Sequence, residues 1–338
     1  MAVVAVFAVL VLVVVVASSG SGGGRALRSP APVDPEEVFD PVEAGERLPA
    51  RFRQLVPRDH ILPVYDPVFV PAGESPWGDE DLVIGVAIDG DARAYPVGFL
   101  DRREMVVDTV GGVPVLVSWC PLCGTAMVHD RTVGERVLVF GNQGALFGNA
   151  MTWWDHDTGS VWSQPLGEAI LGPRSGQTVE LIPSVTTSWG AWRSAHPTTL
   201  ALDAPAGSAS AELDDLVIVV DLGRSAVAYP VAALRSVGVA NDIVASRPVA
   251  VVLDPAGSDR WSVFSREVDG GEVVLAVDGG RLVDTRTRSV FDAVTGVGLE
   301  GPLQGAVLDR LPASTSFPAD VPTFWPGART WPPSIVID

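Results

Sequence analysis

The sequence predicts an α+β fold, mainly antiparallel β, in which two tandem related β-rich domains follow an N-terminal hydrophobic segment. Three observations support this prediction. Short Val-rich runs of strand length alternate with turn residues such as Gly111-Gly112. The segment that begins at Asp81 recurs from Asp215, 134 residues later (215 minus 81). No stretch is long and amphipathic enough for a helical bundle.

The N-terminal segment is the first element to explain. Residues 2–17 are apolar and uncharged, and a Ser/Gly run follows them. The length lies between a signal-peptide core of about 7–15 residues and a transmembrane helix of about 17–25. We therefore expect residues 1–24 to be a signal peptide or a membrane anchor, with residues 2–17 as the tether if uncleaved. The protein is then extracytoplasmic, either secreted or anchored to the cell membrane; a buried core helix is the alternative.

The rest of the chain divides by composition. Residues 25–60 are rich in Pro, Arg and acidic residues and are expected to form a linker that leads away from the membrane. A first β-rich domain is expected over 61–201 and an Ala/Pro/Gly/Ser linker over 202–214. Residues 215–338 are expected to form a degenerate repeat of the first domain.

Composition also limits the partners. The chain has 338 residues, 47% of them hydrophobic, which is enough for a packed core. The formal net charge is -18, and no lysine is present. Because such a surface repels nucleic acid and anionic headgroups, nucleic acid is not expected as a partner.

The repeat also aligns isolated residues. The same offset pairs Asp108 with Asp242, and a later offset of 137 pairs residues 155–159 with 292–296. Within each copy, Val-rich runs predict strands, and two short segments predict helices. The strands are expected at 83–87, 113–119, 126–130, 137–140, 151–154, 161–164, 217–220, 248–253, 261–264 and 273–277, and the helices at 97–103 and 187–195.

The second copy serves as a control for the first. Positions shared by both copies are expected to serve the fold, whereas Cys120 and Cys123 become Asp254 and Gly257. The first copy is therefore expected to hold the functional site, and the second to be a scaffold without it. Residues 153–154 and 162–164 find no clear counterparts in the second copy.

The Cys120-Pro121-Leu122-Cys123-Gly124 motif has three interpretations. In an oxidising compartment the two thiols form a redox-active pair, with Cys120 as the attacking thiolate and Cys123 as the resolving thiol. Arg131, next to Asp130, is expected to stabilise that thiolate. Alternatively the cysteines hold a metal. A zinc site needs four ligands, for which His129, His156, Asp130 or Asp155 are candidates, whereas two thiolates with one more soft ligand suit Cu(I). The third interpretation is an inert disulfide that holds the end of the strand in place. Across the three interpretations, the expected cofactor is copper, zinc or none.

A non-enzymatic binding module is the alternative function. Trp153 and Trp154 are expected on opposite faces of a strand, one in the core and the other available as the floor of a cleft. Asp155, Trp162 and Gln164 complete this expected ligand site with Trp153. His156 is expected to be exposed in a turn, where two neighbouring acids are more simply turn formers than a glycosidase pair.

A set of motifs in the first copy is specific in combination: residues 89–96, Asp108, 118–126, 130–131, 140–141, 155–164 and 167–169. Together they resemble domain-of-unknown-function family 3179, whose bacterial and archaeal members look like exported proteins. The resemblance covers about residues 61–200, and the second copy matches only in its opening. It implies that the cysteines and the segment 162–164 belong to one site, and it does not require His at position 129 or 156.

Overall fold

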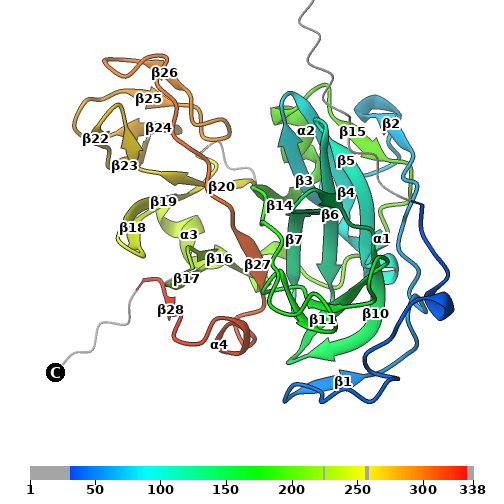
Figure 1. Cartoon of the computed structure of the whole chain (residues 1–338). Helices are drawn as coiled ribbons and strands as arrows, with labels where there is room; N and C mark the ends of the chain where they lie inside the picture. Colours follow the sequence, from blue (N-terminus) through cyan, green and yellow to red (C-terminus); the bar gives the residue numbers. More distant parts are fainter. Residues whose placement is uncertain (1–30, 224, 256–258, 333–338) are drawn as a thin grey trace, which may run out of the picture.

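The computed structural model describes residues 31–223, 225–255 and 259–332, so the expected signal peptide or anchor lies outside the described residues. Among the described residues no helix is long and apolar enough to cross a membrane. The chain forms two β-rich units, with the first on the right of Figure 1 and the second on the left. The fold is mostly antiparallel β, as predicted.

The first unit is built from three main sheets and one small hairpin. The first sheet contains β14 (Ser184–Ser188), β3 (Leu82–Ile88), β4 (Asp91–Pro96), β15 (Leu200–Leu202) and β2 (Phe69–Pro71), in that order. The second contains β5 (Met105–Val110), β6 (Val113–Cys120) and β7 (Thr125–Asp130). The third contains β1 (Phe52–Gln54), β10 (Phe140–Phe147), β11 (Ala150–Asp155), β12 (Val161–Ser163) and β13 (Glu168–Leu171). The hairpin is β8 (Thr132–Val133) with β9 (Arg136–Val137).

The second unit repeats this plan sheet by sheet. Its first sheet contains β27 (Ser314–Ser316), β16 (Val217–Asp221), β17 (Ala226–Pro230) and β28 (Arg329–Thr330). Its second contains β18 (Val239–Val244), β19 (Arg247–Leu253) and β20 (Trp261–Ser265). Its third contains β23 (Leu275–Asp278), β24 (Arg281–Asp284), β25 (Val290–Phe291) and β26 (Gly298–Glu300), and its small hairpin is β21 (Glu267–Val268) with β22 (Gly271–Glu272).

Short helices cover the sheets. They are α1 (Val97–Arg103), α2 (Trp189–Ala195), α3 (Val231–Val237) and α4 (Val321–Phe324), with single 3-10 turns at η1 (Pro35–Glu37), η2 (Ala72–Glu74) and η3 (Leu213–Asp215). α1 and α3 follow the Tyr-Pro pairs that end β4 and β17, where proline is the N-cap. The helices expected at 97–103 and 187–195 are confirmed, except that the second begins at Trp189.

The repeat is visible in hydrogen bonds as well as in topology. Tyr95 donates to a carboxylate oxygen of Asp108 at 2.6 Å, and Tyr229 donates in the same way to Asp242 at 2.9 Å. These residues are paired by the sequence offset, so their shared role is to fasten the first sheet of each unit to the second.

One part of the sequence alignment was wrong. Asp155 binds the amide and hydroxyl of Thr158, and Asp284 binds those of Thr287 in the same way, so the counterpart of Asp155 is Asp284 and not Asp292. Sequence alone misled because Asp292 forms a similar turn with Thr295. The corrected alignment pairs Trp162, Ser163 and Gln164 with Phe291, Asp292 and Ala293.

The expected linker over 25–60 is not a free spacer where it is described. β1 pairs with the edge strand β10, and Arg58 forms an ion pair with Asp40 at 3.1 Å. The Val33 amide donates to Nδ1 of His156, 123 positions further along the chain. An unpaired strand edge and buried polar side chains supply partners for this segment, which therefore packs on the first unit.

The two units share a core. One buried cluster runs from the first sheet of one unit to that of the other and includes Val86, Trp119, Ile218 and Val251. β27 of the second unit packs beside β7 of the first, at the centre of Figure 1. The turn that joins β6 to β7 therefore lies where the units meet.

Candidate functional site

Cys120 ends β6, and the turn to β7 carries Cys123. The amides of Cys123 and Gly124 donate to the Cys120 carbonyl at 3.4 and 3.0 Å. Gly124 has φ +63°, a left-handed conformation that suits glycine, and the site of its absent Cβ lies 2.7 Å from a methyl group of Leu216. The Leu122 side chain is 55% exposed, whereas Cys120 and Cys123 are 1% and 0% exposed. The turn thus exposes Leu122 to solvent and holds both sulfurs inside.

The two sulfurs have unequal acidities. Burial raises the pKa of Cys120, but hydrogen bonds from the Cys123 thiol and the Met151 amide outweigh burial, so the pKa of Cys120 falls below its ordinary value. Burial, together with the hydrogen bond and charge of the Cys120 sulfur, raises the pKa of Cys123 well above its ordinary value. The reduced pair therefore favours a Cys120 thiolate beside a Cys123 thiol.

A buried chain of polar groups leads from Cys123 to Ser118. The Cys123 sulfur lies 3.1 Å from the Thr125 hydroxyl, which donates to Oε1 of Gln164 at 2.6 Å. Nε2 of Gln164 donates to the Ser118 hydroxyl at 3.1 Å and to the Thr125 carbonyl at 3.2 Å. Since a carbonyl only accepts, this contact fixes the orientation of the Gln164 amide, and the Thr125 proton is directed to Oε1.

The second unit covers the turn. The Phe317 amide donates to the Cys123 carbonyl at 2.7 Å, and the Thr315 hydroxyl donates to the Gly124 carbonyl at 2.9 Å. The apolar cluster around the cysteines also includes Val321 and Phe324 of α4. Access to the sulfurs therefore requires movement at the contact between the units.

Arg131 does not lie beside the cysteines, so its expected role in stabilising the thiolate was wrong. In the β6–β7 hairpin Cys120 is opposite Thr125 and Val115 is opposite Asp130, so Asp130 and Arg131 lie at the far end, about 17 Å along the strands. The Asp130 carboxylate accepts from the Thr132 amide at 2.7 Å in a local turn.

Arg131 is instead a buried clamp on the backbone. It donates to the carbonyls of Val115 and Asp108, both at 3.0 Å, and to that of Leu138. Burial lowers its pKa to about 10. In the second unit Arg266 makes the matching bonds, at 3.1 Å to Val249, 2.9 Å to Val273 and 3.2 Å to Asp242. A residue with the same contacts in both units serves the fold.

The histidines do not complete a metal site. His129 is 2% exposed and packs edge-on against Trp153, with ring centroids 5.1 Å apart, and burial lowers its pKa to about 3. His156 is 6% exposed, contrary to expectation, because it stacks on Trp154 and accepts from Val33. In the part of the chain that the structure describes, no three side chains among His, Cys, Asp and Glu are grouped to hold a metal ion.

The expected ligand-binding residues are all buried. Trp162 donates to Asp155 at 2.9 Å, and neither side chain is exposed. Trp153 faces the cysteine cluster, and the other face of its strand is also covered, because Arg58 lies over Trp154. The structure thus brings Trp153, Trp162 and Gln164 to the cysteines as packing and hydrogen-bonding neighbours, not as the walls of an open cleft.

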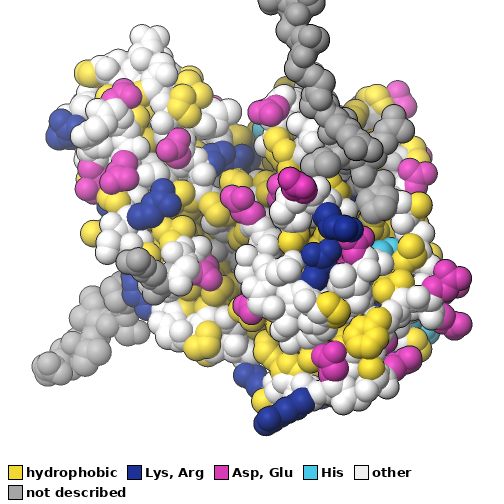
Figure 2. Space-filling view, viewed as in Figure 1, with side chains coloured by type: hydrophobic (Ala, Val, Ile, Leu, Met, Phe, Trp, Pro, Cys, Tyr) yellow, Lys and Arg dark blue, Asp and Glu magenta, His cyan; other side chains and the backbone are white. Residues whose placement is uncertain are grey.

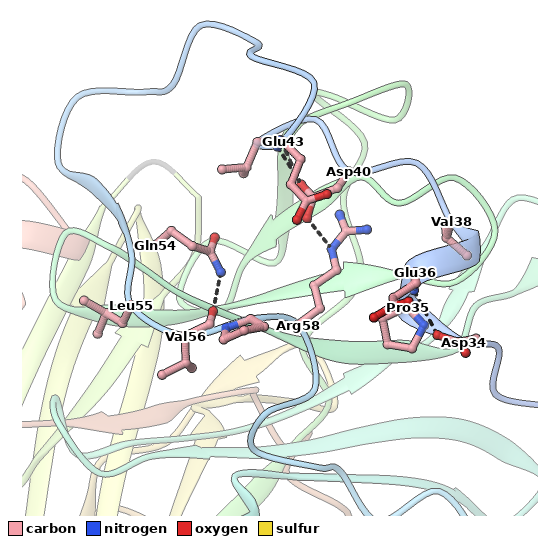
Figure 3. Close-up of a pocket in the computed structure, with 12 residues that line it drawn as sticks. Asp34, Pro35, Glu36, Val38, Asp40, Glu43, Gln54, Leu55, Val56 and Arg58 are labelled. Carbon is pink, nitrogen blue, oxygen red and sulfur yellow. Dashed lines mark hydrogen bonds and ion pairs between the residues drawn. The ribbon is translucent and has the colours of Figure 1, made fainter.

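The surface offers a cavity elsewhere. A cavity of about 780 Å³ lies between residues 34–43 and 54–58, where Figure 3 shows Arg58 pointing toward Asp40 and Glu43. It contains neither cysteine. Figure 2 shows Asp and Glu side chains scattered over the visible face rather than gathered into one patch.

Several site residues were missed by the sequence analysis. Ser118 and Thr125 stand within the recognised motif, but their hydrogen bonds to Gln164 depend on the pairing of distant strands. Met151 contacts Cys120 through its backbone, and Thr315 comes from the second unit. Alternation along β6 could have placed Ser118 on the same face as Cys120. No local pattern in the sequence indicates Met151 or Thr315.

Comparison with known families agrees with the duplication of the fold. A family described as "Protein of unknown function (DUF3179)" matches residues 58–211 and again residues 205–329. The chain belongs to this family. Both units are thus DUF3179 regions, so the second copy matches well beyond its opening segment. No curated protein and no solved structure gives a significant match.

Proposed function

We propose that this DUF3179 protein is an exported thiol–disulfide redox protein whose working group is the Cys120–Cys123 pair. The observation that carries the proposal is the pair of free, buried cysteines at one turn of the first unit, whose places in the second unit are taken by Asp254 and Gly257. The hydrophobic segment over residues 2–17 supports export to a compartment in which disulfides form.

The chemistry is a two-electron exchange. The Cys120 thiolate attacks one sulfur of a disulfide and expels the other as a thiolate, which leaves a mixed disulfide. Cys123 then loses its proton and attacks the Cys120 sulfur, which closes the internal disulfide and releases the second thiolate. Because both sulfurs are buried, the oxidant is a small disulfide, or the turn first moves away from Phe317.

The test is the reduction potential of the pair, measured by equilibrating the purified full chain in glutathione buffers and counting alkylated thiols by mass. A potential above about -270 mV, in the range of exchanging proteins, is expected. A potential below about -300 mV, typical of structural disulfides, would contradict the proposal.

Two matched variants test the order of attack. Cys123→Ser should trap a mixed disulfide with glutathione at Cys120, whereas Cys120→Ser should form far less adduct at Cys123, which is the weaker nucleophile. Equal adduct formation by both variants would show that the two cysteines do not have the proposed roles.

A further inference from the structure

The sulfur atoms of this chain are not distributed at random. The sequence contains two cysteines and four methionines, of which one is Met1. The other three, Met105, Met127 and Met151, all belong to the buried cluster that contains Cys120 and Cys123. Every sulfur atom after Met1 therefore lies in one region of a 338-residue chain, and the second unit has none.

Strand register places the thioethers near the thiols. In the second sheet Ser118 of β6 lies directly opposite Met105 on one neighbouring strand, β5, and opposite Met127 on the other, β7. Ser118 is two residues before Cys120 on the same face of β6, so each methionine is a diagonal neighbour of Cys120 at about 7–8 Å between backbones, within reach of a long side chain. Met151 belongs to the same buried cluster and lies on β11 of the third sheet. Methionines from three strands thus share the cluster that contains Cys120.

The chemistry of the donors selects the ion. Thiolates and thioethers are soft ligands, which Cu(I) prefers. A structural zinc ion needs four ligands from Cys, His, Asp and Glu, and the described residues bring no three of these together. Methionine adds donor atoms without adding charge, which matters in an apolar pocket because unbalanced buried charge is costly. The three methionines are 0%, 1% and 3% exposed, so water would be excluded from a bound ion.

We propose that the reduced chain binds one Cu(I) ion at this sulfur cluster, with Cys120 and Cys123 as the thiol ligands and methionine thioethers as the remaining donors. Binding displaces the thiol proton of Cys123 and involves no electron transfer. The inference deepens the proposed function, on which it rests, because the dithiol that binds the ion is the reduced form of the redox pair. Oxidation to the disulfide would release the ion.

The experiment uses the purified full chain, reduced and handled without oxygen. Cu(I) is delivered and competed with a chromogenic Cu(I) chelator, and X-ray absorption reports the ligand atoms. One equivalent of Cu(I) with sulfur-only coordination is expected. Absence of binding by the reduced chain, or nitrogen or oxygen ligands in the absorption spectrum, would overturn the proposal.

Two variants separate the thiols from the thioethers. Cys120→Ser should abolish binding. Changing all three methionines to leucine conserves core volume and should weaken Cu(I) binding at least tenfold. Leu275→Met, a similar exchange in the core of the second unit, is the control and should leave the affinity unchanged. An unchanged Cu(I) affinity in the triple leucine variant would show that the thioethers are not ligands, which would overturn the proposal.

The redox proposal is judged separately, because the potential of the cysteine pair is measured on metal-free protein. A pair with an exchanging potential but no Cu(I) affinity would overturn this inference alone. A pair with a potential below about -300 mV that still binds Cu(I) when reduced would overturn the redox function alone.

Discussion

The two units build the same hairpin end with different chemistry. In the first unit Cys120 lies opposite Thr125, and the pair is covered by Phe317 of the second unit. In the second unit the equivalent residues Asp254 and Arg260 form an ion pair at 2.7 Å, and Arg260 donates to the Ala191 carbonyl of the first unit at 3.2 Å. Each hairpin end thus faces the other unit.

The space around the two hairpin ends also differs. In the second unit a cavity of about 630 Å³ is lined by Asp254, Arg260 and α2 residues such as Ala191. In the first unit the cysteines lie in an apolar cluster that includes Phe324 of α4. The fold therefore accepts either a charged, open end or a sulfur-containing, closed end, and the dithiol is not needed to form the hairpin.

The third sheets show how the closed end is made. The first-unit hairpin runs from Phe140 to Asp155, and its counterpart runs only from Leu275 to Asp284, which is six residues shorter (16 against 10). The added length carries Met151, whose amide contacts Cys120. The extension and the cysteines occur together in one unit, which links the longer hairpin to the site.

The largest effect is expected at the shared clamp. Arg131→Met removes three hydrogen bonds to buried carbonyls and should reduce the free energy of unfolding by about 3 kcal/mol or more. Arg266→Met should cost a comparable amount, as measured by urea unfolding. The reduction potential of the cysteine pair should not change in either variant. A shift of that potential in Arg131→Met alone would show that Arg131 does act on the cysteine pair.

The next effect is expected at the polar chain that only the first unit has. Gln164→Ala installs the residue of the second unit, Ala293, and leaves Thr125 and Ser118 without their partner. We expect a loss of about 2 kcal/mol in unfolding free energy and a higher reactivity of Cys123 toward iodoacetamide. Unchanged stability would mean that water replaces the amide and that the chain of hydrogen bonds does not hold the cysteine turn.

A smaller, pH-dependent effect is expected at His156, where the second unit has Thr285. Burial lowers the pKa of His156 to about 4, so the folded state holds the neutral ring. The stability that depends on this ring is fully present above about pH 6.5 and is lost as the pH falls toward 4, at no more than about 1.4 kcal/mol per pH unit, the limit for the uptake of one proton. His156→Gln should flatten the acid side of the unfolding curve over that window; the same slope in the variant would place the acid sensitivity elsewhere.

The smallest effect separates two equivalent tyrosines. Tyr95→Phe and Tyr229→Phe each remove one bond to a carboxylate, at 2.6 Å and 2.9 Å. The Tyr95 bond is the shorter and the more buried of the two, so Tyr95→Phe should cost about 1 kcal/mol more than Tyr229→Phe. Equal losses in thermal unfolding would show that the two fastenings are energetically equivalent.

The duplication, the antiparallel β class and the position of the cysteine turn could all be predicted from the sequence. Each of these depends on local features: alternation of side chains, turn residues, and motifs that recur at a fixed offset. The strand over 113–119, the helix over 97–103 and the pairing of Asp108 with Asp242 were predicted correctly for this reason.

The residues that surround the sulfurs could be identified only from the three-dimensional structure. Arg131 is eight residues after Cys123 yet lies at the far end of the hairpin, because register and not sequence distance sets neighbours in a sheet. Thr315 is 192 positions after Cys123 (315 minus 123), yet its hydroxyl donates to the carbonyl of Gly124, the residue that follows Cys123 in the turn. The three methionines, spread from 105 to 151, enter the buried cluster of Cys120 only when three strands pair and the second sheet packs against the third. Contacts of this kind depend on packing between elements, which no local pattern in the chain encodes.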